Sequence, residues 1–159
     1  MLRPLCQTDA EFLCSIFKDN LEYYNIFYDS ESDVSEWEKR VGWFIKQEKI
    51  HHYIIENDNK SIGWFSYEDM EKGERGVGIL VIKQNYLRNG FGASVLLEFL
   101  ENCKMDNIHT VYLSVNQDNQ RAINFYQGFG FEIYEEEVIP QCNEAINLAQ
   151  YKMRLHQTT

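Results

Sequence analysis

Apolar residues recur at helical spacing in four parts of the chain. A capping-box pattern at residues 8–11 precedes Phe12, Leu13, Ile16 and Phe17, and a second one, from Ser35 to Glu38, opens a stretch that keeps one face apolar from residue 34 to 45. Residues 95–103 also share an apolar face, and residues 119–126 have the pattern of a short helix that ends at Gly128 or Gly130. The sequence therefore predicts about four helices.

The periodicity changes between residues 52 and 82. Residues 52–55 and 62–67 are rich in β-branched and aromatic side chains, and the turn-forming residues 57–60 between them predict a hairpin. A third run, residues 77–82, is almost wholly apolar, as in a strand covered on both faces. Residues 111–115 alternate, and two more strands are expected at 131–138 and about 146–155. These elements predict a single αβ domain over residues 1–159 with a mixed sheet.

Composition narrows the function classes. The chain of 159 residues has a net charge of −10, which disfavours a nucleic-acid partner because phosphate contacts need clustered Lys and Arg. The four cysteines are scattered without a C-x-x-C pair, so no metal site is expected. No apolar run is long enough to span a membrane, and the first residues lack the apolar stretch of a signal peptide. A cytoplasmic protein without a membrane partner is expected.

Two glycines follow the apolar strand at 79–82. Gly90 and Gly92 stand in a loop that leads into the helix at 95–103, where backbone N–H groups at a helix N-terminus suit a pyrophosphate. Taken alone, the pair fits an ordinary tight turn equally well. A Walker A loop is excluded because G-K-[ST] is absent, and a dinucleotide-binding G-x-G-x-x-G is incomplete because Val95 replaces its third glycine.

A second motif accompanies this turn. Residues 119–131 match N-x-x-A-x-x-F-Y-x-x-x-G-F at Asn119, Ala122, Phe125, Tyr126, Gly130 and Phe131. The two segments together, with 3–9 and 151–155 at the ends, resemble the GNAT superfamily of N-acetyltransferases over nearly the whole chain. The first motif departs from the usual [QR]-x-x-G-x-[GA] because Leu87 replaces its Gln or Arg, and Gln84 stands where a proline is common. The resemblance implies a central mixed, largely antiparallel sheet of about seven strands flanked by about four helices.

The resemblance also implies acetyl-CoA as co-substrate and a site for it. Backbone groups of the strand pair with the pantetheine arm, those of the turn hold the pyrophosphate, and Arg88 adds a charge. These expected cofactor-binding residues are Leu80, Ile82, Arg88, Asn89, Gly90, Phe91, Gly92, Ala93 and Asn119. Asn119 alternatively serves only as a helix cap. Glycines 76 and 78 mark either a β-bulge nearby or packing against a large neighbour.

The same resemblance implies an acyl transfer with Tyr126 as the acid that protonates the leaving thiolate. The alternative for Tyr126 is a half-buried aromatic on an amphipathic helix. The general base stays unassigned among Glu68, Asp69, Glu71 and Glu74. A further possibility, from a different class, is a non-catalytic module that binds acyl-CoA as a sensor.

The acceptor pocket of the family is lined by the segment between the first two helices and by the loop between the last two strands. Tyr24, Tyr28 and Glu31 lie in the first segment, and Glu135, Glu136 and Glu137 precede the second. Acids beside aromatics attract cations, which predicts a positively charged small-molecule amine or a basic peptide. One alternative is that the acids only form the solvent-exposed start of a helix. Another is that the exposed aromatics form a homodimer contact.

Overall fold

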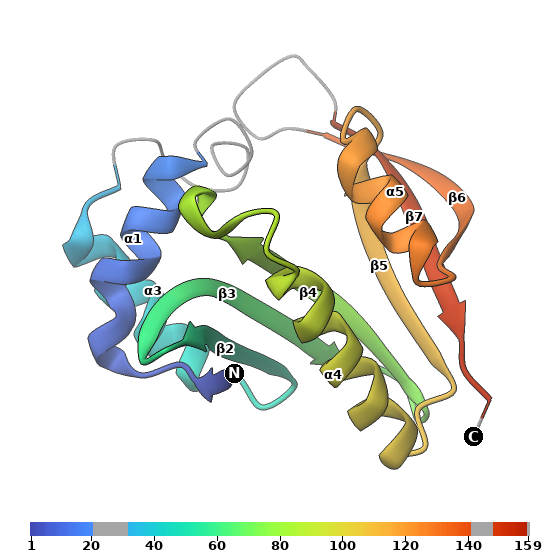
Figure 1. Ribbon diagram of the computed structural model, residues 1–159, viewed down its shortest axis with the longest axis horizontal. Helices are drawn as coiled ribbons and strands as arrows, with labels where there is room; N and C mark the ends of the chain where they lie inside the picture. Colours follow the sequence, from blue (N-terminus) through green and yellow to red (C-terminus); the bar gives the residue numbers. More distant parts are fainter. Residues whose placement is uncertain (21–31, 141–147, 159) are drawn as a thin grey trace. The chain divides into compact units, whose positions relative to one another are not determined.

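The computed structural model describes residues 1–20, 32–140 and 148–158 (Figure 1). The elements, in chain order, are β1 (Leu2–Pro4), η1 (Gln7–Asp9), α1 (Ala10–Asp19), α3 (Val34–Ile45), β2 (Ile50–Asn57), β3 (Lys60–Asp69), β4 (Glu74–Ile82), η2 (Gln84–Tyr86), α4 (Phe91–Met105), β5 (Thr110–Asn116), α5 (Gln120–Gly128), β6 (Glu132–Ile139) and β7 (Leu148–His156). The strand order is β1-β2-β3-β4-β5-β7-β6. The β4–β5 pair is parallel, and the β1–β2, β2–β3, β5–β7 and β6–β7 pairs are antiparallel, which confirms the predicted sheet. Over the described ranges, no helix is long and apolar enough to cross a membrane.

The chain divides into two compact units. The first comprises Met1–Glu68 and Ile79–Glu101, and the second comprises Asp69–Gly78 and Asn102–Thr159. Strand β4 passes from the second unit into the first between Gly78 and Ile79, and α4 passes from the first into the second after Glu101.

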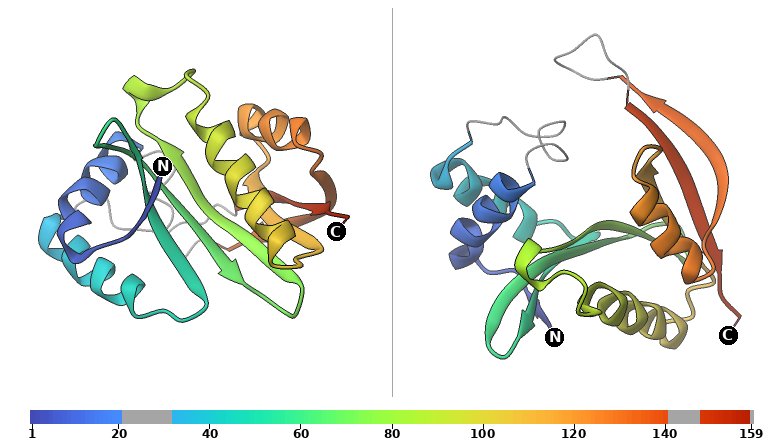
Figure 2. Two further views of the ribbon diagram at one scale, coloured as in Figure 1. Left: turned by 60° about the horizontal axis from the view of Figure 1, so that its bottom comes forward. Right: turned by 45° about the horizontal axis from the view of Figure 1, so that its top comes forward.

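In the first unit, both faces of β3 are buried. Trp64 contacts Trp37 of α3 with ring centroids 6.0 Å apart, whereas Phe65 contacts Phe99 of α4 at 5.3 Å. Consecutive strand residues point to opposite faces, so α1 and α3 cover one face of β2 and β3 and α4 covers the other (Figure 2). The apolar run from Ile62 to Phe65 in β3 follows from this double coverage.

The β2–β3 hairpin confirms the prediction from residues 57–60. Asp58 and Asn59 have φ angles of 51° and 62° between the paired residues Asn57 and Lys60. Two central residues with positive φ match the right-handed twist of the flanking strands, and Asn and Asp tolerate that conformation best after glycine.

The first two helices are capped differently from the prediction. Helix α1 begins at Ala10, and the carboxylate of Asp9 turns back to accept hydrogen bonds from the N–H of Cys6 (2.7 Å) and from Arg3 (2.9 and 3.0 Å). Burial acts to raise the pKa of Asp9, but these hydrogen bonds outweigh it and the pKa is lowered. Helix α3 is capped by Asp33, which accepts from the N–H of Glu36 at 3.0 Å, so the capping box expected at Ser35 is wrong.

The second unit contains β5, α5, β6 and β7. Val111, Leu113 and Val115 are buried, which confirms the alternation expected for β5. Seven residues of β5 pair with β7, from Thr110 opposite His156 to Asn116 opposite Gln150. β6 is mostly exposed and pairs with β7, and its register shifts between Ile133 and Glu135.

A half-buried histidine connects β2 to the core of the first unit. His52 stacks on Phe44 with ring centroids 4.4 Å apart, and its Nδ1 accepts a hydrogen bond from the indole N–H of Trp64 at 3.1 Å. An accepting Nδ1 requires the neutral ring with the proton on Nε2. Burial, with a smaller contribution from His51, lowers the pKa of His52 to about 4.

We therefore expect stability to decrease below neutral pH. In unfolded chains, His52 takes up its proton near pH 6.5, but in the folded chain only near 4, so folding loses free energy as pH falls through that window. After allowance for the exposed part of the ring, the free energy of unfolding should fall by about 1 kcal/mol between pH 7 and pH 5. Urea unfolding at both pH values measures this difference. His52→Gln keeps an acceptor for Trp64 and should reduce the pH dependence, whereas His51→Gln should not; an unchanged dependence in His52→Gln contradicts the assignment.

Candidate functional site

The glycine-containing turn lies between the end of β4 at Ile82 and the start of α4 at Phe91. Arg88 and Gly90 have φ angles of 66° and 77°. A Cβ atom built on Gly90 would meet no atom within 4 Å, so the glycine is required by its backbone conformation and not by close packing in the chain itself. The main chain at this turn therefore borders open space that a ligand can occupy.

The first turn of α4 presents donors toward this space. The N–H and the hydroxyl of Ser94 both donate to the carbonyl of Gly90 at 3.0 Å, which is the first hydrogen bond of the helical pattern. The N–H groups of Phe91, Gly92 and Ala93 precede it and have no helical acceptor. Such donors at the positive end of a helix dipole favour an anion.

The residues before Gly90 shape the turn. The amide of Asn89 donates to the carbonyls of Tyr86 and Leu87 at 3.2 and 3.3 Å. Arg88 is exposed, so its guanidinium lies in solvent at the turn, whereas Leu87 is half-buried. Leu87 has no polar side chain to offer a phosphate, and Arg88 is the cationic residue that this turn supplies.

The pairing of β4 with β5 covers only the first residues of β4. The parallel pairing joins only Glu74, Arg75 and Gly76 to the three residues Thr110–Tyr112. Leu80 and Ile82 lie beyond that pairing. The side chain of Ile82 lies on the α4 face, beside Gly63 and Ile55, and Leu80 shares that face by alternation.

The second motif builds both ends of α5. The side chain of Asn119 caps the helix by accepting from the N–H of Ala122 at 3.2 Å. At the other end, Gly130 has a φ of +97° and its N–H donates to Gln127, while the N–H of Phe131 donates to the carbonyl of Tyr126. These are the two hydrogen bonds of a Schellman motif. Gly130, and not Gly128, thus provides the left-handed residue that ends the helix.

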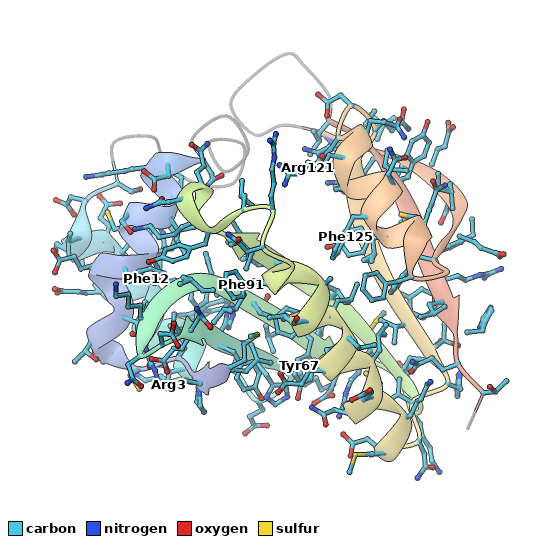
Figure 3. All side chains as sticks on the ribbon, viewed as in Figure 1. Arg3, Phe12, Tyr67, Phe91, Arg121 and Phe125 are labelled. Atoms are coloured by element: carbon cyan, nitrogen blue, oxygen red, sulfur yellow. The ribbon has the colours of Figure 1, made fainter. Side chains whose placement is uncertain are left out.

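Tyr126 is held by its aromatic neighbours. Its ring lies 5.7 Å from that of Phe131 and 5.2 Å from that of Phe125, both in edge-to-face geometry. The contact between Tyr126 and Phe131 is the apolar contact that accompanies a Schellman motif. Tyr126 is partly buried, so the structural role expected as the alternative for Tyr126 is present. Phe125 and Arg121 lie on the same short helix (Figure 3).

The carboxylates considered as a general base are placed differently. Glu74 accepts a hydrogen bond from the hydroxyl of Tyr112 at 2.7 Å, which raises the pKa of that tyrosine. Asp69 forms an ion pair with Arg75 at 2.9 Å, and Arg75 also contacts Asp106 at 3.0 Å. Glu68 and Glu71 are exposed. The structure therefore singles out none of the four as a base.

The predicted residues fall into three groups. Leu80, Ile82 and residues 88–93 lie together in the first unit, whereas Asn119 and Tyr126 lie in the second. Tyr24, Tyr28 and Glu31 lie outside the described residues. Among the residues that the structure describes, no three His, Cys, Asp or Glu side chains are grouped to hold a metal ion.

One residue in this region was missed by the sequence analysis. Ser66 of β3 is 3% exposed, and its hydroxyl accepts a hydrogen bond from the N–H of Ile79 at 2.9 Å. A serine in an apolar strand carries no recognisable signal in the sequence. Its contact depends on the pairing of β3 with β4.

Two relatives share sequence with the chain. N-alpha-acetyltransferase 50 of Danio rerio is 45% identical over 51 residues, which is 31% of this chain and 30% of the relative. An uncharacterized N-acetyltransferase of Methanocaldococcus jannaschii is 21% identical over 144 residues, which is 87% of this chain and 62% of the relative. The matches thus span less than two thirds of the length of either relative.

Solved structures share the fold. A probable acetyltransferase of the GNAT family from Chromobacterium violaceum superposes with a TM-score of 0.83 at 13% identity, covering 98% of this chain and 86% of its own. Spermidine N-acetyltransferase from Vibrio cholerae, in complex with CoA and spermine, has a TM-score of 0.79 at 19% identity and covers 99% and 95%. The sequence profile of the acetyltransferase (GNAT) family matches residues 13–131. With three quarters of its length in that match, the chain belongs to the acetyltransferase (GNAT) family.

Proposed function

We propose that this protein is an N-acetyltransferase that moves the acetyl group of acetyl-CoA to a primary amine. The observation that carries the proposal is the turn at Gly90, which opens α4 with three N–H groups beside a main chain bordering open space. Membership of the family supports acetyl-CoA as co-substrate, and a structural relative was solved with CoA.

The cofactor is proposed to bind along the first unit. The pyrophosphate is held by the N–H groups of Phe91, Gly92 and Ala93, with the guanidinium of Arg88 as a charge-assisted partner. Peptide groups of Leu80 and Ile82 pair with the amides of the pantetheine arm, because β5 pairs only with Glu74–Gly76. Asn119 is proposed to contact the cofactor in addition to its role as a cap.

The chemistry is a direct attack of the amine on the thioester. The neutral nitrogen forms a bond to the carbonyl carbon, and a backbone N–H of β4 stabilises the oxyanion. The C–S bond then breaks, the amine nitrogen loses a proton to water or to a base, and the CoA thiolate receives one from the hydroxyl of Tyr126. Solvent restores the proton of Tyr126.

The acceptor is proposed to be a positively charged amine. The net charge of −10 supports a cationic partner, as does the row of acids on β6. Lys152 lies 3.4 Å from Glu135 and 3.8 Å from Glu137, so part of that row is already neutralised within the chain. Tyr24, Tyr28 and Glu31 are proposed to line the acceptor pocket. Spermidine N-acetyltransferase is among the structural relatives, whereas the relative from Danio rerio favours the alternative, a protein N-acetyltransferase.

Acetyl-CoA should stabilise the folded chain. A ligand at one hundred times its dissociation constant adds about 2.7 kcal/mol, so the melting temperature should rise by about 5 °C or more. Arg88→Ala should weaken binding about fivefold through loss of one charge-assisted contact. Lys60→Ala, which removes an exposed charge from the β2–β3 hairpin, is the matched control. Thermal shift and calorimetry with acetyl-CoA measure both effects; no shift in the wild-type chain contradicts the cofactor proposal.

Tyr126→Phe should lower kcat about 100-fold while leaving the affinity for acetyl-CoA within twofold. The substitution keeps the ring that packs on Phe131 and removes only the hydroxyl, so loss of the proton donor is separated from loss of packing. Tyr134→Phe on β6 is the control for removing a tyrosine hydroxyl elsewhere. Unchanged turnover in Tyr126→Phe limits this residue to its structural role.

A screen over amines, monitored by released CoA, should find polyamines and other cations preferred by tenfold or more over neutral and anionic amino acids. The preference should weaken as salt is added, because screening reduces the attraction between exposed charges. A preference for neutral or anionic acceptors overturns the cationic acceptor, and a preference for peptides selects the protein N-acetyltransferase. Binding of acetyl-CoA without release of CoA for any acceptor selects the sensor module instead.

A further inference from the structure

Strand β4 has one residue more than the part of β3 with which it pairs. Near the hairpin turn, the N–H of Met70 donates to the carbonyl of Glu74 at 3.1 Å, and at the far end the N–H of Lys83 donates to the carbonyl of Ile62 at 2.8 Å. Met70 and Ile62 are eight residues apart, but Glu74 and Lys83 are nine apart. In a regular antiparallel pair these two distances are equal, so β4 contains a β-bulge.

The Ser66–Ile79 bond marks where the bulge ends. Ser66 is as many residues from Ile62 along β3 as Ile79 is from Lys83 along β4, so the two pairs share one register. The additional residue of β4 therefore lies before Ile79. The N–H of Ile79 donates to the hydroxyl of Ser66 at 2.9 Å. A side chain of β3 thus binds the main chain of β4 at the point where the register changes. Because Ser66 is buried, water cannot replace it.

The bulge decides which N–H groups of β4 face away from β3. Successive N–H groups of a strand point to opposite edges, and those of Ile79 and Lys83 point toward β3. Those of Leu80 and Ile82 therefore point to the opposite edge. If the register of Met70 and Glu74 had continued along β4, the N–H groups of Leu80 and Ile82 would point toward β3. Those of Ile79 and Lys83 would then point away from it. The pairing with β5 has ended at Gly76, so nothing in that ladder engages Leu80 or Ile82.

We infer that Ser66 is a positioning residue for acyl transfer: its hydroxyl holds the bulged β4 in the register that aims the N–H groups of Leu80 and Ile82 at the thioester and the pantetheine arm. The inference rests on the proposed acetyl-CoA site. Ser66 touches neither substrate nor cofactor and acts through the main chain of β4. Its loss removes the acceptor that this hydroxyl offers to the N–H of Ile79, which favours a shift of the strand register.

The test uses infrared spectroscopy of bound acetyl-CoA labelled with ¹³C at the thioester carbonyl, together with steady-state kinetics. In the wild-type chain the carbonyl stretch should shift to lower frequency on binding, because a donor N–H polarises the C=O bond. In Ser66→Ala this shift should fall by at least half, kcat should fall about tenfold, and the dissociation constant of CoA should stay within threefold. Ser66→Thr, which keeps the hydroxyl, should restore both the shift and kcat.

Val41→Ala controls for stability, because it opens a cavity in the core of the first unit but leaves the hydroxyl of Ser66 and its bond to Ile79 in place. It should lower the melting temperature at least as much as Ser66→Ala yet keep the wild-type carbonyl shift. An unchanged carbonyl shift in Ser66→Ala overturns the inference while the acetyl-CoA site stands. Failure of the wild-type chain to bind acetyl-CoA overturns the proposed function itself. The two failures are therefore distinct.

Discussion

The direction of every N–H group in the second half of β4 depends on one additional residue in that strand. A regular strand would pair with β3 in a single register from the turn at residue 70 to Lys83, but the bonds at its two ends differ by one residue. Strand β4 therefore has one register against β3 near Glu74, where it also pairs with β5. It has another register against β3 near Ile82, where it leads into the turn at Gly90. A bulge stabilised by a buried side-chain hydroxyl reconciles the two registers.

Both motifs of the chain combine a helix end with a residue in the left-handed conformation. Gly90 adopts it just before α4, and Gly130 adopts it just after α5. At Gly90 the conformation exposes the first donors of a helix toward open space, whereas at Gly130 it redirects the last donors back onto the helix. The same property of glycine thus provides a binding surface in one place and a closed helix end in the other. For Tyr126 this means that its ring is positioned by the cap itself.

Buried polar groups in the first unit are paired in ways that apolar periodicity does not reveal. Asp9 joins Arg3 and the main chain of Cys6 instead of capping α1, and His52 accepts from Trp64 while it stacks on Phe44. Each of these pairs joins residues that packing brings together at the edge of one core. These polar groups meet their partners only in the folded unit. Each partner is needed there, because a buried polar group without one costs more free energy than a hydrogen bond contributes.

The sequence by itself determined the four main helices, every strand except β1, the strand-turn-helix around Gly90 and the role of Asn119 as the cap of α5. These are local features, since periodicity, turn chemistry and helix capping act over a few residues. It predicted a cap at Ser35 where Asp33 provides it, and it left Gly128 and Gly130 open as the helix end, because neighbouring residues offer the same chemistry. For the glycines at 76 and 78 it left a bulge and packing against a large neighbour open, and Gly76 does lie near Met70. Only the tertiary structure decided where the register of β4 changes and that Ser66 holds it, because both depend on which residue of β3 comes to lie opposite Ile79.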